Sequence, residues 1–157
     1  MKTNNTYYRA AVGAFIVNED GRLMVILKHN YIDKWNIVKG GIEKGETELE
    51  ALKRELREEL GPIKYKIIIK SKIASAVIIP SSATDEYIGQ ARNHYWIFVS
   101  KYEKFQVPSE EVEKIKWIDI ASGEIKKYFG IHDEDGVLQS LLPIEWEQVR
   151  KLVQKLF

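Results

Sequence analysis

The chain has 157 residues, of which 45% are hydrophobic, and its 24 basic residues nearly balance its 23 acidic ones. This length and composition suffice for a buried core, and no Pro-, Gly- or Ser-rich linker, repeat or low-complexity tract divides the chain, so we expect one domain over residues 1–157. The balanced charge disfavours a DNA partner, the lack of cysteine excludes disulfides and a thiol nucleophile, and the lack of a long apolar run or a secretory signal predicts a cytoplasmic protein with no membrane partner.

Two apolar runs near the start of the chain predict the first strands. These runs are Ala10–Val17 and Leu23–Leu27, and the segment between them, Asn-Glu-Asp-Gly-Arg at 18–22, is typical of a hairpin turn. We therefore expect two strands joined by a tight connection.

The segment after these strands predicts a glycine-rich loop and then a helix. Thr47 and Glu50 form a capping-box pattern, so the helix should begin near Thr47, and Gly61 followed by Pro62 should end it. A loop rich in glycine lets the backbone approach a metal ion or a phosphate group closely. The glycines of this loop are Gly40, Gly41 and Gly45.

Apolar and acidic residues occupy separate faces of this helix. At about 100° per residue, one stripe contains the leucines at 49, 52, 56 and 60, while Glu55, Glu58 and Glu59 share a patch to one side. Each adjacent like-charge pair destabilises a helix by roughly 0.2–0.5 kcal/mol, and a divalent cation would remove this repulsion. Carboxylates suit Mg²⁺ or Mn²⁺, and Mg²⁺ often completes its shell with phosphate oxygens. The patch predicts a Mg²⁺ site, with Mn²⁺ as a second choice, and a solvated acidic face is the alternative interpretation.

The second half of the chain predicts three further strands and two helices. The last helix carries an apolar stripe that suits core packing, and a homodimer face is the alternative interpretation. The polar segment 81–92 is long enough to form a lid over a substrate. The expected strands are Tyr65–Ile79, His94–Val99 and Ile115–Ile120, and the expected helices are Ser122–Phe129 and Pro143–Phe157.

The spacing around the first helix resembles the Nudix box, the signature of the Nudix hydrolase family. Gly40 and Glu46 stand at the family's distances from the run 54–61, Arg-Glu-Leu-Arg-Glu-Glu-Leu-Gly, and only Pro62 departs from the pattern, where the family prefers an aliphatic residue. The resemblance implies an α/β fold, an α/β/α sandwich around a mixed sheet. It also implies a divalent-metal hydrolase that cleaves a nucleoside diphosphate linked to another moiety, by water attack on phosphorus.

The resemblance further implies roles for individual residues. Arg54 would orient the helix glutamates, with Glu46 as its partner from the loop. The metal ligands would be the Gly40 carbonyl and the carboxylates of Glu46, Glu55, Glu58 and Glu59.

Two residues are candidates for the general base. Glu58 is the first choice, because a helix glutamate fills this role in some family members. Glu111 is the alternative, because many members carry an acidic residue just before a hydrophobic strand of this sort. The other interpretation of Glu111 is a solvated turn residue.

Substrate choice has two weaker signals. The segment 35–41, Trp-Asn-Ile-Val-Lys-Gly-Gly, resembles the Trp-x-x-Pro-Lys/Gln-Gly segment of diadenosine tetraphosphate hydrolases and bacterial RNA pyrophosphohydrolases, except that Val38 replaces the proline. Lys39 would add positive charge beside a polyphosphate. The segment 93–96 is similar to an aromatic strand of the dinucleoside polyphosphate group, so His94, Tyr95 and Trp96 are candidates to contact a base, although alternate residues face opposite sides.

These signals together predict a Mg²⁺-dependent hydrolase of a dinucleoside polyphosphate or a related nucleotide 5′-polyphosphate, with a triphosphorylated RNA 5′ end as a further substrate. An ADP-ribose or nucleotide-sugar pyrophosphatase is the alternative enzyme. A catalytically silent nucleotide-binding regulator is the alternative function, and the complete set of glutamates argues against it.

Overall fold

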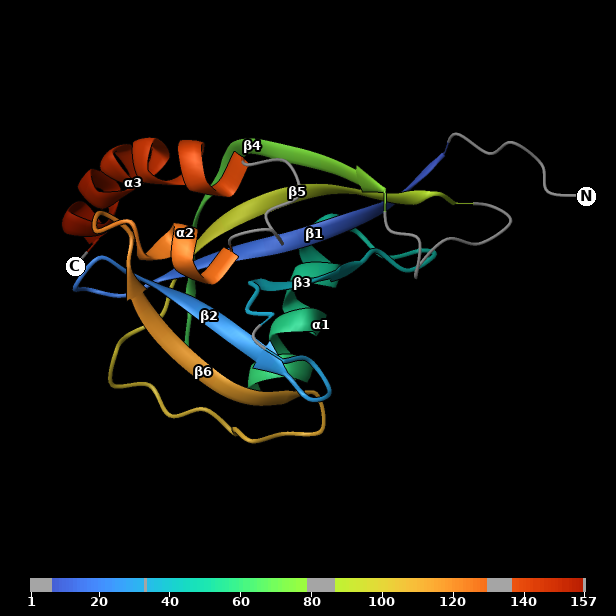
Figure 1. Cartoon of the computed structure of the whole chain (residues 1–157), viewed down its shortest axis with the longest axis horizontal. Coiled ribbons are helices and arrows are strands. Elements are labelled where there is room, and N and C mark those ends of the chain that lie inside the picture. The colour runs from blue at the N-terminus through green and yellow to red at the C-terminus, as the bar shows by residue number, and fades with distance from the viewer. Residues whose placement is uncertain (1–6, 33, 79–86, 130–136, 157) are drawn as a thin grey trace, which may run out of the picture.

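The computed structural model describes residues 7–32, 34–78, 87–129 and 137–156, with only the backbone described at 77, 78 and 137–140. The described residues form three strands, a helix, three more strands and two final helices, which confirms the α/β class (Figure 1). In chain order the elements are β1 (Tyr8–Val17), β2 (Arg22–Lys28), β3 (Val38–Gly41), α1 (Glu48–Leu60), β4 (Lys66–Ile78), β5 (Gly89–Phe98), β6 (Val112–Asp119), α2 (Glu124–Phe129) and α3 (Val137–Leu156).

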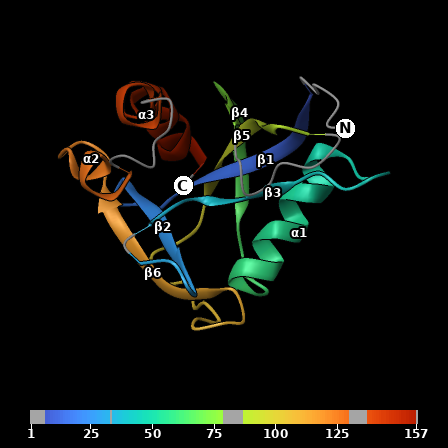
Figure 2. The same ribbon diagram turned by 45° about the vertical axis from the view of Figure 1, so that its right-hand side comes forward.

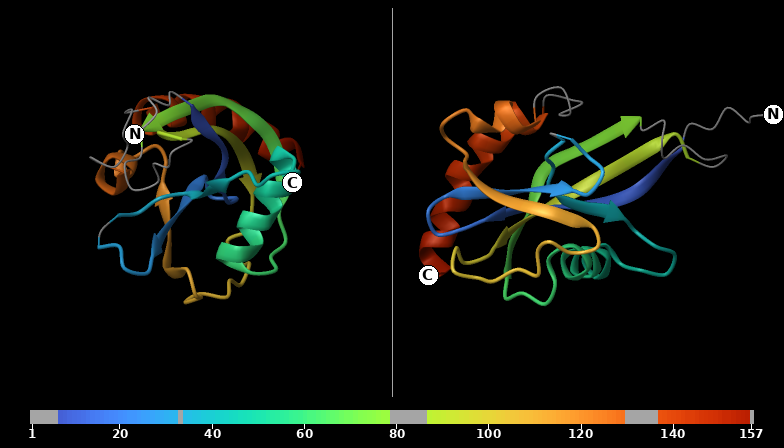
Figure 3. Two further views of the ribbon diagram at one scale, coloured as in Figure 1. Left: turned by 90° about the vertical axis from the view of Figure 1, so that its right-hand side faces the viewer. Right: turned by 60° about the horizontal axis from the view of Figure 1, so that its bottom comes forward.

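Strand β1 is the centre of a mixed sheet with the order β4-β5-β1-β2-β6. It pairs in parallel with β5 along its whole length, from Tyr8 opposite Gly89 to Val17 opposite Phe98, and the two strands run side by side in Figure 3. Its other edge pairs antiparallel with β3 and then, at Val17, with β2. Since β2 pairs with β1 only at the hairpin, the β2–β6 ribbon is free to diverge from β1.

Helices cover both faces of the sheet, which confirms the predicted α/β/α sandwich. Figure 2 shows α1 on one side of the strands and α2 with α3 on the other. The core on the α1 side contains Leu52, Leu56 and Leu60, each fully buried. The opposite core is built around aromatic rings, namely Phe15, Trp96, Phe129 and Trp146.

Helix α1 begins and ends where the sequence predicted. The Thr47 hydroxyl accepts a hydrogen bond from the backbone N–H of Glu50 at 3.2 Å, and Gly61 stops the helix with a positive φ of 81°. One position of the leucine stripe departs from the prediction, because Leu49 is 43% exposed. The buried positions begin at Ala51, so the first turn lies outside the packed interface.

The glycine-rich segment differs from the predicted loop. Gly40 and Gly41 end strand β3, which pairs with Ala11 and Val12 of β1. Pairing with the distant strand β1 stabilises this strand, since a Val-Lys-Gly-Gly sequence has little strand propensity of its own. The loop is therefore confined to the residues between Gly41 and α1.

Strand β5 and helix α3 begin earlier than predicted. Strand β5 begins at Gly89, so the end of the predicted lid belongs to the sheet, and residues 81–86 lie outside the described residues. Helix α3 begins at Val137, which puts Pro143 inside the helix. Its stripe packs in the core through Trp146, Val149 and Val153. Within the described ranges, no helix has both the length and the apolar character needed to cross a membrane.

Candidate active site

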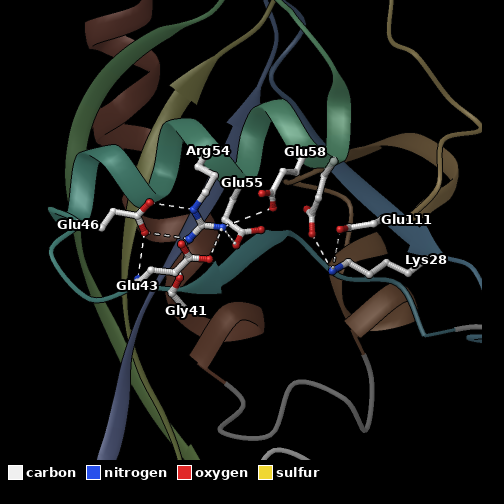
Figure 4. A network of polar contacts seen from close by, with 9 residues as sticks. Lys28, Gly41, Glu43, Glu46, Arg54, Glu55, Glu58 and Glu111 are labelled. Carbon is white, nitrogen blue, oxygen red and sulfur yellow. Dashed lines mark hydrogen bonds and ion pairs between the residues drawn. The ribbon is translucent and has the colours of Figure 1, made fainter.

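Arg54 on α1 joins the helix to the preceding loop. Its guanidinium donates two hydrogen bonds to the Glu46 carboxylate, at 2.8 and 2.9 Å, and a third to the Gly41 carbonyl at 2.9 Å (Figure 4). It also donates to Glu55 at 2.8 Å and to Glu58 at 3.4 Å. These contacts fix the guanidinium between the loop and the helix, and the hydrogen bonds from Arg54 lower the pKa of Glu46 to about 2.

Glu55 lies against the backbone of β3. A Cβ atom at Gly40 would stand only 2.0 Å from Oε1 of Glu55, so a glycine is required for this approach. The Glu55 carboxyl is mostly buried, and burial raises its pKa despite the neighbouring guanidinium of Arg54. Gly40 and Glu55 therefore form one close contact between strand and helix.

Glu59 is the most buried of the helix glutamates. Its exposed fraction is 0%, and neither carboxylate oxygen has a hydrogen-bond partner among the described residues. The Lys28 ammonium lies 2.7 Å from Oε1 and forms an ion pair with it, so Oε2 is left without any partner among the described residues. Burial raises the pKa of Glu59 to about 7, and the attraction of Lys28 only partly opposes this shift. An unsatisfied buried carboxylate is rare in proteins and indicates that a partner belongs there.

Both candidate bases lie at this cluster. Glu58 is on the exposed edge of α1, with 46% of its side chain accessible and one long contact to Arg54. Glu111 directly precedes β6, and its carboxylate stands 4.0 Å from Lys28 (Figure 4). The pairing of β6 with β2 brings Glu111 to the site, because the backbone N–H of His29 donates to the Glu111 carbonyl at 3.1 Å.

The chemistry of these residues fits a divalent cation. Glu55 and Glu59 offer hard oxygen donors in a mostly buried setting, and Glu59 has no partner among the described residues beyond its ion pair with Lys28. As they stand, the carboxylates are drawn toward Arg54 and Lys28, and no three acidic or histidine side chains among the described residues surround a common point. Coordination of one ion by all of these carboxylates would therefore require some of the side chains to move.

The structure corrects the expectation that His94 and Trp96 contact a base. Both rings are buried on the α3 side, with exposed fractions of 2% and 0%. Nδ1 of His94 lies 3.0 Å from the Ile73 carbonyl, and the ring stacks on Phe15 at 4.7 Å. Nε1 of Trp96 donates to Glu145 of α3. The aromatic pattern of β5 thus reflects core packing at these two positions.

Tyr95 faces the opposite side of β5 and is tied to the start of α1. Its hydroxyl donates to Glu48 at 2.5 Å, and the same carboxylate accepts from Asn93 at 2.9 Å and pairs with Lys70 at 2.9 Å. Burial and the Glu48 carboxylate raise the pKa of Tyr95 to about 12. This ring supports the helix that carries the glutamates.

Lys39 is next to Gly40 in sequence but faces away from the glutamates. Its neighbours in β3, Val38 and Gly40, face α1, and alternation along the strand directs Lys39 to the other side. Lys39 and His94 both pair with Gly13 of β1, from its two edges. The Lys39 side chain therefore lies away from the glutamates, and its contact with a polyphosphate chain stays a prediction.

Sequence reasoning missed two residues of the site, Lys28 and Glu48. Lys28 ends the apolar run of β2, and a charge at the end of a buried strand was the available signal. Glu48 lies in the first turn of α1, where an acidic residue is common for other reasons, so its sequence position carried no signal.

Comparisons with known proteins indicate the family of this chain. The sequence model of the NUDIX domain matches residues 7–137. The RNA pyrophosphohydrolase of Hydrogenovibrio crunogenus is 30% identical over 123 residues, which cover 71% of this chain and 74% of that protein. The RNA pyrophosphohydrolase of a Wolbachia species from Brugia malayi is 32% identical over 100 residues, covering 60% and 61%. That of Halorhodospira halophila is 46% identical over 54 residues, covering 34% and 29%.

The chain therefore spans less than two thirds of the length of two of these three relatives. Among solved structures, a C. elegans Ap4A hydrolase has a TM-score of 0.58 at 17% identity, covering 82% of this chain and 92% of that one. The E. coli dihydroneopterin triphosphate pyrophosphohydrolase has a TM-score of 0.57 at 20% identity, covering 87% and 99%. These likenesses confirm the fold, and the match of the domain over residues 7–137 shows that the chain belongs to the Nudix hydrolase family.

Proposed function

We propose that this protein hydrolyses a pyrophosphate bond of a nucleotide 5′-polyphosphate, with triphosphorylated RNA 5′ ends and dinucleoside polyphosphates as the substrate class. The observation that carries the proposal is the glutamate cluster of α1, in which Glu55, Glu58 and Glu59 meet two cations, Arg54 and Lys28. The relatives of this chain named RNA pyrophosphohydrolase support an RNA 5′ end as a substrate.

Nudix hydrolases generally use divalent metals, and we propose Mg²⁺, with Mn²⁺ as a substitute. The ion would be held by the carboxylates of Glu55, Glu58 and Glu59, with the Gly40 carbonyl and Glu46 as further donors. When bound, a divalent ion offsets negative charge on phosphate oxygens and makes water a usable nucleophile near neutral pH.

The chain's own residues would then position the metal donors and deprotonate the attacking water. Arg54 holds Glu46 and Glu55 in fixed orientations, which keeps these donors in place without a substrate. Glu58 is accessible and lightly held, as a residue that accepts a proton from water must be. Glu111 is equally accessible on the other side of Lys28 and stays the alternative base.

A panel of three substrates tests this proposal. The purified protein with Mg²⁺ is given a 5′-triphosphorylated RNA oligonucleotide, diadenosine tetraphosphate and ADP-ribose, and the products are identified by mass spectrometry. We expect cleavage of the first two with a higher kcat/KM than for ADP-ribose. Efficient cleavage of ADP-ribose alone would move the protein to the ADP-ribose pyrophosphatases, and tight binding without turnover of any of the three would indicate a silent regulator.

A further inference from the structure

The pairing of Lys28 with Glu59 joins a cation from β2 to a fully buried carboxylate of α1. The ammonium lies 2.7 Å from Oε1 of Glu59, and 36% of the lysine side chain remains exposed. Figure 4 shows the lysine reaching across the end of the cluster toward α1. The ion pair thus connects the solvent-facing edge of the site to its buried part.

The backbone fixes Lys28 at this place. It is the last residue of β2, and the register with β6 shifts between Leu27 and Lys28, so that Lys28 lies opposite Val112. Beyond this irregularity the chain turns, and the N–H of His29 donates to the carbonyl of Glu111. Glu111 is consequently the second acidic neighbour of Lys28, at 4.0 Å.

The buried carboxylate of Glu59 is stable in its ionised form only beside a positive charge. Removing a carboxylate from water carries a large penalty, and an ion pair repays it only when further hydrogen bonds complete the shell. Apart from the contact of Oε1 with Lys28, neither oxygen of Glu59 has a partner within the described residues, so Lys28 alone compensates the charge of this carboxylate there. The same two oxygens are the donors that a hard divalent cation would take.

We propose that Lys28 is a built-in counter-ion of Glu59 that a divalent cation displaces when it binds. This inference rests on the proposed metal site. Two cations cannot share one small carboxylate at contact distance without strong repulsion, so occupation by the metal releases the lysine. The released ammonium stays tethered to β2 beside Glu111, its other acidic neighbour. Lys28 therefore stabilises the metal-free protein and lowers the affinity for the metal.

Calorimetric titration of Mg²⁺ into metal-free protein tests the competition. Lys28→Met should bind Mg²⁺ at least about fivefold more tightly than the wild type, because no ammonium has to leave. A change of about fivefold is the lower end of typical coupling between two ligands. Lys28→Arg keeps the competing charge and should stay closer to the wild type. Lys101→Met is the matched control, because Lys101 pairs with Asp20 at the surface of the β1–β2 hairpin. The Mg²⁺ affinity of this variant should equal that of the wild type.

A second measurement follows the lysine in the wild-type protein itself. The side-chain ¹⁵N resonance of Lys28 in the wild-type protein, assigned by its absence from Lys28→Met, should shift as Mg²⁺ is added and follow the calorimetric saturation. An unchanged resonance at saturation, or a Lys28→Met affinity equal to or weaker than that of the wild type, would overturn the proposal while leaving the metal site intact. Failure of the wild type to bind Mg²⁺ would overturn the metal site itself.

Discussion

At the scale of single residues, surroundings give similar carboxyl groups different properties. Glu46 is held ionised by the guanidinium of Arg54, which lowers its pKa to about 2, whereas burial raises the pKa of Glu59 to about 7. Both residues belong to the Nudix box and are only 13 positions apart in the sequence. Glu46 is suited to orienting Arg54, and Glu59 is suited to receiving a cation.

The choice of general base is tested by two glutamine variants. If Glu58 accepts the proton, Glu58→Gln should lower kcat at least 10²-fold, or about 2.7 kcal/mol of transition-state stabilisation, with the fold unchanged by circular dichroism. Glu111→Gln should then act like Glu113→Gln, a control two residues further along the chain in β6. A steep loss in Glu111→Gln alone would assign the base to Glu111, and two mild effects would remove both from the role.

His94 gives the folded protein a pH-dependent stability. Burial lowers its pKa to about 4, with Arg92 and Lys39 adding to the shift and the Ile73 carbonyl and Glu145 opposing it. The unfolded chain protonates this ring near pH 6.5, so its contribution is complete above pH 6.5 and is lost as the pH falls toward 4. The full effect is about 3 kcal/mol.

The measurement is the free energy of unfolding by urea from pH 7 to pH 4.5, for the wild type and His94→Gln. Glu59 contributes the opposite slope in this window, because its raised pKa removes stability as the pH rises from 4.5 to about 7. The difference between the two proteins isolates the histidine. We expect this difference to shrink as the pH falls, and parallel curves would show that the ring at position 94 does not titrate in this way.

At the scale of elements, α1 and β3 act as one unit because Glu55 sits directly on the backbone of Gly40. Gly40→Ala would put a methyl group 2.0 Å from the present position of Oε1, and the flexible end of Glu55 would have to move. We expect a loss of about 10- to 100-fold in Mg²⁺ affinity or activity, as is typical when a ligand loses its support. Gly123→Ala is the control for general strain, because its Cβ would meet no neighbour but its φ of 80° is unfavourable for alanine, and an equal loss of Mg²⁺ affinity in the two variants would contradict the account.

One carboxylate of helix α3 adds hydrogen bonds to its apolar packing on the sheet. Glu145 accepts hydrogen bonds from Ser71 at 2.5 Å, from the backbone N–H of Lys72 at 3.1 Å, and from Trp96. Glu145→Gln should destabilise the protein by about 1–3 kcal/mol in urea unfolding, because charged acceptors make the stronger bonds. Glu147→Gln, whose side chain is 64% exposed, should change stability little. A Glu145→Gln variant as stable as Glu147→Gln would show that this contact does not hold the helix.

Local signals explain how far the sequence predicted these elements. The bounds of α1 followed from Thr47 and Gly61, since caps and stops act within a few residues. Strand β3 was missed because its pairing with β1 is non-local, and Lys28 was missed because only the β2–β6 register brings it to α1. The burial of His94 and Trp96 depends on α3 and β4, which no pattern within β5 reveals.

At the scale of the whole molecule, the site forms where two edge strands on the same side of β1, β3 and β6, approach one helix. Strand β3 and its loop supply Gly40, Gly41 and Glu46, while the β2–β6 ribbon supplies Lys28 and Glu111. Helix α1 runs between these edges and carries the remaining carboxylates (Figure 4). The central claim is that this arrangement hydrolyses a pyrophosphate bond with a divalent cation.

The most direct test of that claim is the initial rate of cleavage of a 5′-triphosphorylated RNA oligonucleotide, measured with saturating Mg²⁺ and again with excess EDTA. The wild-type protein should release phosphate or pyrophosphate with Mg²⁺, and EDTA should abolish the release. Glu59→Gln, which removes the charge of the most buried ligand, should be at least about 10²-fold slower under the same conditions. Equal rates with and without EDTA, or full activity in Glu59→Gln, would contradict the account.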